Sequence, residues 1–127
     1  MKIALASIGL SALLAATPFA VDAATSLRGV MHVWRAEARK THDMLAGRTG
    51  FDEGAIRAAL QTYVEDAGRL GARVNGRSAP AQDFRRRLLG FAADARTALN
   101  HVGQRPVLKA DFSRLLSDCQ SCHNRFN

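Results

Sequence analysis

The sequence has 127 residues, a length that suits one domain. Its 18 lysines and arginines outnumber the 11 acidic residues, which gives a net charge of +7 at pH 7. The densest basic run is Arg85-Arg86-Arg87, and two interpretations of it stay open: a solvated helix face, or a docking face for an acidic partner. No nucleic-acid-binding motif accompanies the charge, so we do not expect nucleic acid as a partner.

The first 23 residues have the pattern of a cleavable export signal. Lys2 provides the positive start, Ile3 to Ala16 form an almost unbroken apolar run, and Val21-Asp22-Ala23 resembles a cleavage site. The apolar run is too short for a membrane anchor, which needs about 20 residues. We therefore expect a signal peptide at 1–23, a mature domain at 24–127, a periplasmic location and no stable membrane insertion.

Four later segments repeat one spacing of seam positions, in alternating steps of four and three residues. This spacing places side chains along one side of a helix, as in a helix bundle. The seam positions are Leu27, Met31, Trp34, Ala38, Thr41 and Leu45; Ile56, Leu60, Tyr63, Ala67, Leu70 and Val74; Phe84, Leu88, Phe91, Ala95, Ala98 and Val102; and Leu108, Phe112, Leu115, Cys119, Cys122 and Phe126.

Helix-ending and helix-starting residues separate these segments. Gly47 ends the first segment, and Asp52 is a suitable N-cap for the second. Ser78 is the expected cap of the third segment, and Pro106 opens the fourth. No alternating β-type runs are present. The sequence therefore predicts an all-α fold, an up-down-up-down antiparallel four-helix bundle.

The fourth segment ends in the pattern C-x-x-C-H, formed by Cys119-Gln120-Ser121-Cys122-His123. This pattern is the attachment signature of c-type haem, in which two thiols bond to the haem and the histidine supplies an axial nitrogen to the iron. Other interpretations are a redox disulfide, a structural disulfide or part of a zinc site. Zinc would need further ligands, and His101 is the one nearby candidate. We expect one covalently bound haem c.

A haem pentapeptide at the end of a four-helix chain resembles the class II c-type cytochromes, the cytochrome c′ family. The match extends over the whole expected mature domain, and its last block is the specific part. The matching residues are Leu27 to Met31, Gly50-Phe51-Asp52, Ser78 and Pro80, Leu108-Lys109-Ala110, and Cys119 to Phe126. One departure is Asn127, which follows Phe126 where the family usually has a basic residue.

The resemblance implies His123 as the proximal iron ligand and a distal side built from the first helix. In low-spin members a methionine twenty residues before the inter-helix aromatic is the sixth ligand, and Met31 has this relation to Phe51. His32 is the next candidate, although it points about 100° away from Met31 on a helix. The family also dimerises often, so the resemblance leaves a homodimer open.

Several other residues are candidates for the haem pocket. Most are seam residues that belong to the core on any account, and Arg28 is a candidate partner of a haem propionate. The candidates besides Met31 are Arg28, Trp34, Phe84, Phe91 and Phe126.

These observations favour a periplasmic one-electron carrier with His123 and Met31 as axial ligands, because His/Met is a standard cytochrome pair. Its partners would be redox proteins, with acidic surfaces among the candidates. No general base accompanies a substrate pocket, so we do not expect an enzyme. One alternative is a five-coordinate, cytochrome c′-like module that binds nitric oxide or carbon monoxide. Another is a helical protein that haem merely stabilises.

Overall fold

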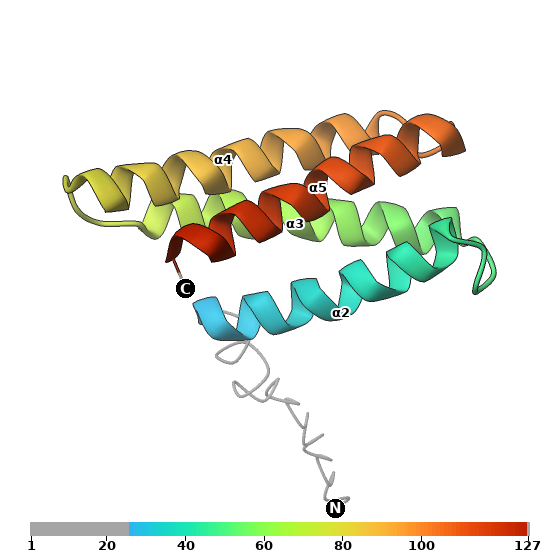
Figure 1. Ribbon diagram of the computed structural model, residues 1–127, viewed down its shortest axis with the longest axis horizontal. Coiled ribbons are helices and arrows are strands. Elements are labelled where there is room, and N and C mark those ends of the chain that lie inside the picture. Colours follow the sequence, from blue (N-terminus) through green and yellow to red (C-terminus); the bar gives the residue numbers. More distant parts are fainter. Residues whose placement is uncertain (1–25, 127) are drawn as a thin grey trace, which may run out of the picture.

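The computed structural model describes residues 26–126, which form four helices. The helices are α2 (Leu27–Leu45), α3 (Glu53–Arg73), α4 (Ala79–Leu99) and α5 (Arg105–Phe126) (Figure 1). This part of the chain contains no strand, so the predicted all-α class with four helices is confirmed. The predicted signal peptide at 1–23 lies outside the described residues, as does Asn127.

The helices are packed unevenly. α3 packs along α4 and α4 packs along α5, whereas α2 contacts α3 and α5 more sparsely. Figure 1 shows α2 diverging from the other three helices over part of its length. α2 is therefore the helix that packs least closely against the rest of the domain.

The predicted seams supply most of the core, which is consistent with a four-helix bundle. The fully or nearly fully buried apolar side chains are Val30, Trp34, Ile56, Ala59, Leu60, Tyr63, Ala67, Leu88, Phe91, Ala92, Ala95, Ala98, Val102, Leu108, Phe112 and Leu115. In α2 the buried side is rotated relative to the prediction. Val30 is buried although it lies beside the expected seam, and the seam residue Leu27 is 45% exposed. The seam residues Met31 and Ala38 are only partly buried against the core, and both also line a cavity.

Local capping explains where two of the helices begin. The Asp52 side chain accepts a hydrogen bond from the Ala55 amide at 3.0 Å. The Ser78 hydroxyl accepts one from the Ala81 amide at 3.3 Å. Both predicted N-caps are therefore confirmed. The third helix ends at Leu99, before the last position of its predicted seam, Val102, which is buried in the turn that follows.

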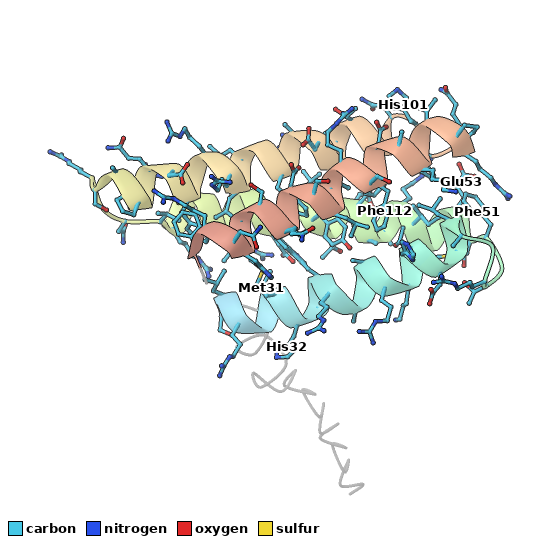
Figure 2. The ribbon with its side chains drawn as sticks, in the orientation of Figure 1. Met31, His32, Phe51, Glu53, His101 and Phe112 are labelled. Atoms are coloured by element: carbon cyan, nitrogen blue, oxygen red, sulfur yellow. The ribbon has the colours of Figure 1, made fainter. Side chains whose placement is uncertain are left out.

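The two ends of the domain differ in character. Figure 2 shows Phe51, Glu53 and His101 at the end opposite Met31 and His32. At the Phe51 end, the Arg105 guanidinium lies 3.8 Å from the centre of the Phe51 ring.

Among the described residues, no helix is both long enough and apolar enough to cross a membrane.

Candidate functional site

A cavity of about 560 Å³ lies between α2 and α5, with its floor formed by α3 and α4. Its walls are mainly apolar and aromatic. The lining residues are Arg28, Met31, His32, Trp34, Arg35, Ala38, Tyr63, Phe91, Phe112, Leu115, Leu116, Cys119 and His123. Arg28, His32, Arg35 and His123 are exposed, so the cavity opens to solvent between the two helices.

Three aromatic rings from three helices form the floor. The Trp34 and Phe91 rings are stacked, with centroids 4.8 Å apart and planes 27° apart. Tyr63 meets Trp34 edge-on at 5.7 Å and lies 5.4 Å from Phe91. These stacked and edge-on contacts form an apolar aromatic surface. Trp34 and Phe91 contribute to this surface next to Met31 and Cys119.

Two hydrogen bonds fix this floor to α2. The Trp34 indole Nε1 donates to Asp66 Oδ2 at 3.1 Å. The Tyr63 hydroxyl donates to the Trp34 carbonyl oxygen at 3.3 Å. Burial, reinforced by nearby Cys119 and Glu37, raises the pKa of Tyr63 well above its usual value, so the hydroxyl stays protonated and remains a donor.

The α5 wall presents the cysteine–histidine motif. Cys119 and His123 line the main cavity, and Cys122 lines an adjoining cavity of about 30 Å³ that also touches Cys119 and His123. Both cysteines are partly buried free thiols. Burial raises the pKa of Cys119 to about 11 and that of Cys122 in the same direction. At neutral pH both sulfurs are therefore uncharged and compatible with an apolar cavity.

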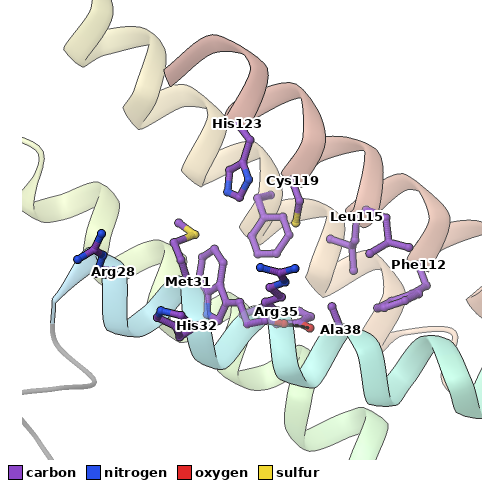
Figure 3. A pocket seen from close by; sticks show the side chains of 13 residues that line it. Arg28, Met31, His32, Arg35, Ala38, Phe112, Leu115, Cys119 and His123 are labelled. Atoms are coloured by element: carbon purple, nitrogen blue, oxygen red, sulfur yellow. Dashed lines mark hydrogen bonds between the residues drawn. The ribbon is translucent and has the colours of Figure 1, made fainter. Parts of the chain in front are cut away.

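The α2 wall presents the distal candidates. Figure 3 shows the sulfur of Met31 and the imidazole of His123 directed into the cavity from opposite helices. His32 and Arg35 also line the cavity, although Met31 alone was preferred from the sequence. In Figure 3 the Arg35 guanidinium extends toward Cys119. Arg35 was not predicted because it lies beside the seam position Trp34 and not on the seam itself.

Most predicted pocket residues meet at this cavity, and two do not. Arg28, Met31, Trp34 and Phe91 line it together with Cys119 and His123, and Cys122 is in the adjoining space. Phe84 and Phe126 line neither cavity. Instead their rings pack against each other, with centroids 5.2 Å apart and planes 70° apart. The seam places them one turn beyond the cavity, where α4 and the last turn of α5 meet.

The cavity and its donors fit a haem. Its volume lies within the range of about 300–1,000 Å³ that is usual for cofactor sites, and its walls are apolar. Haem iron has its own ring nitrogens, so the protein need supply only axial donors such as His123 and Met31. A bare metal ion needs a cluster of ligands. Residues 26–126 contain no group of three or more His, Cys, Asp or Glu residues that would hold one.

Comparisons with protein-family models, with curated proteins and with solved structures give no match to this chain.

Proposed function

We propose that this protein is a one-electron carrier with one covalently attached haem c. Cys119 and Cys122 would form the two thioether bonds, and His123 and Met31 would be the proximal and distal iron ligands. One observation supports this most strongly: Met31 and His123 line the same apolar cavity from opposite helices, with Cys119 on its wall. The C-x-x-C-H spacing independently favours haem attachment.

The haem would supply the one-electron ferric–ferrous chemistry, and the chain's residues would set its conditions. Trp34 and Phe91 form a stacked surface that keeps water from the cavity floor. The Tyr63 hydroxyl donates a hydrogen bond to the backbone carbonyl oxygen of Trp34, which helps to keep this surface fixed. Methionine as an axial ligand raises the reduction potential, which suits a carrier. A fixed ligand pair and a well-packed apolar floor favour rapid electron exchange because little has to rearrange.

The wider proposal follows the resemblance to class II c-type cytochromes. It comprises the up-down-up-down antiparallel order of the four helices, export to the periplasm, and redox proteins as partners. We infer electron transfer rather than enzymatic turnover as the activity. The exposed Arg28 on the cavity rim is the proposed partner of a haem propionate. Whether two copies associate is a separate question that sedimentation of the purified protein would answer.

Mass and thiol measurements test the covalent link. The protein exported by a host that attaches c-type haem should gain the mass of one haem. After denaturation it should contain no titratable thiol, because both sulfurs are then thioethers. A protein with the unmodified mass and two titratable thiols would contradict the proposal. Replacing Cys119 and Cys122 together by alanine is the control that should abolish covalent haem.

Absorption spectra test the distal ligand. With Met31 bound, the ferric protein should be low-spin with a sulfur-to-iron band, and the ferrous protein should not respond to carbon monoxide. Met31→Leu should change the spin state and allow carbon monoxide to bind. Met44→Leu is a matched control, because Met44 packs near the core but does not line the cavity. An unchanged spectrum in Met31→Leu would remove Met31 as a ligand.

One observation favours the alternative of gas binding. The cavity is open to solvent between α2 and α5, and Met31 is only partly buried, so a small molecule has access to the distal side. A high-spin spectrum with ready carbon monoxide uptake in the unmodified protein would favour this alternative and would exclude Met31 as a stable ligand.

A further inference from the structure

A basic stripe runs along one face of α2. It consists of Arg28, His32, Arg35, Arg39 and His42, which are separated by steps of four, three, four and three residues. This spacing keeps all five on one side of the helix. Each of the five residues is exposed. The stripe is therefore a continuous surface feature that extends over most of α2.

The stripe has no internal counter-charge. Within residues 26–126, none of its five side chains makes a hydrogen bond or an ion pair. Both acidic residues of α2 form ion pairs with basic residues outside the stripe. Glu37 pairs with Lys40 at 3.6 Å, and Asp43 pairs with Arg48 at 3.2 Å. Arg35 and Arg39 are like charges at i, i+4, a spacing that destabilises a helix by about 0.2–0.5 kcal/mol. An acidic surface laid against the stripe would relieve this repulsion.

The arginine run on α4 behaves differently. Arg86 and Arg87 both pair with Asp83, at 3.4 and 3.2 Å, and hold the pKa of that carboxyl below its usual value. Arg85 donates to the Val74 carbonyl oxygen. Of the two interpretations that the sequence left open for this run, the solvated helix face fits these contacts, because its charges have partners within the domain. Among the described residues, α2 instead carries a continuous row of basic side chains without ion pairs.

The stripe borders the cavity and continues past it. Arg28, His32 and Arg35 line the cavity, but Arg39 and His42 do not. Carboxylates of a ligand in the cavity would account for the first three residues only. The last two need an occupant that extends along the helix outside the cavity, which is the property of a macromolecular surface.

We propose that the basic stripe of α2 is the docking surface for an acidic face of a partner protein. The proposal depends on the proposed function, because docking beside the cavity would bring the partner to the cofactor's exposed edge. Exposed charges of this kind speed encounter and fix orientation. A membrane-binding helix would need an exposed apolar side next to its charges. Here Met31 and Ala38, which flank the stripe, face the cavity, and the exposed large apolar side chains of α2, Leu27 and Val33, are single residues rather than a continuous side.

Binding to immobilised poly-L-glutamate tests the docking surface with a defined acidic probe. Arg39→Gln, outside the cavity, should weaken retention about threefold relative to the original protein. The double variant Arg35→Gln with Arg39→Gln should weaken it about threefold further than Arg39→Gln alone, as expected for exposed ion pairs. The matched controls are Arg96→Gln and the pair Arg77→Gln with Arg96→Gln. These arginines are exposed and make no side-chain hydrogen bond or ion pair within the described residues, so the controls remove equal charge elsewhere and should change retention much less.

The outcomes separate the docking proposal from its rivals. Equal losses in stripe and control variants would mean that only net charge matters, and would overturn it. Binding to phosphatidylglycerol vesicles but not to poly-L-glutamate would indicate a membrane surface, and would also overturn it. The absorption spectrum of each sample reports haem separately. A protein without haem would refute the proposed function, while stripe-specific retention would still support an acid-binding surface.

Discussion

The hydroxyl of Tyr63 on α3 donates a hydrogen bond to the backbone carbonyl oxygen of Trp34 on α2, at 3.3 Å. Tyr63 is 2% exposed and Trp34 is 6% exposed, so this contact lies within the core. It matters because α2 is the helix that packs least closely against the others. The contact therefore helps to position the cavity wall on which Met31 lies.

Replacing Tyr63 by phenylalanine should lower the free energy of unfolding by about 0.5–1.5 kcal/mol, because the ring is kept and one buried hydrogen bond is lost. Urea unfolding of the purified protein measures this. Thr62→Val is the control. The Thr62 hydroxyl donates an exposed hydrogen bond within α3, to the Ala58 carbonyl oxygen. Losing this bond should cost much less. Equal losses in the two variants would contradict a specific role for the α2–α3 contact.

The N-cap of α3 gives a second prediction. Asp52→Ala should destabilise the protein by about 1 kcal/mol, since the Ala55 amide loses its acceptor. Asp52→Asn should stay close to the original stability, because asparagine also caps helices well. Thermal or urea unfolding of the three proteins measures both differences. If asparagine cost as much as alanine, the carboxylate charge rather than the cap would be responsible.

The existence of the four helices and most of their buried sides could be predicted from local sequence; the rotated buried side of α2 and the end of α4 at Leu99 could not. Asp52 and Ser78 cap helices where local chemistry predicts it. In α3, the seam residues Ile56 and Leu60 are at most 1% exposed. These features depend on neighbours within a few residues along the chain, which is the range over which periodicity and capping rules apply.

The cavity was only partly predictable because it depends on how far α2 stands from α5. The spacing placed Phe84 on the same seam as Phe91, and Phe126 on the same seam as Cys119, yet of the three phenylalanines only Phe91 lines the cavity. The sequence also gave no reason to rank Arg35 as a lining residue, since its side chain reaches the cavity from the edge of the seam. Such distances are set by packing between helices rather than by spacing within one.

A third prediction concerns His101, which pairs with Asp111 through Nδ1 and Oδ2 at 2.6 Å. Asp111 is 6% exposed, and its other contact, with Arg114, is longer at 3.9 Å. His101→Ala leaves this buried carboxylate poorly satisfied and should cost about 1–3 kcal/mol. His101→Gln keeps a donor and should cost less.

Urea unfolding measures the His101 variants, and their absorption spectra provide an internal control. His101 lies at the end of the domain away from Met31 (Figure 2). Both variants should therefore retain the spectrum of the original protein. A spectral change would mean that this end of the domain is coupled to the cavity, and equal destabilisation by alanine and glutamine would argue against the hydrogen bond.

Asp118 on α5 precedes the first cysteine of the motif and lies beside Asp94 on α4. Its Oδ2 atom is buried and has no hydrogen-bond partner among the described residues. A proton shared between the two carboxyl groups would satisfy that oxygen. Burial first, and then Asp94, raises the pKa of Asp118 from 3.8 to about 7.

This raised pKa predicts a stability that falls with rising pH. The protonated carboxyl is favoured in the folded protein, so its contribution is complete below pH 3.8 and is lost as the pH rises through about 7. Asp118→Asn should remove this loss and make the protein about 1–2 kcal/mol more stable above pH 7. That figure is below the full equivalent of the shift because the side chain is only partly buried. Urea unfolding at several pH values gives the difference between the two proteins. The difference should grow between pH 4 and pH 7, and a constant difference would show that Asp118 does not titrate in this range.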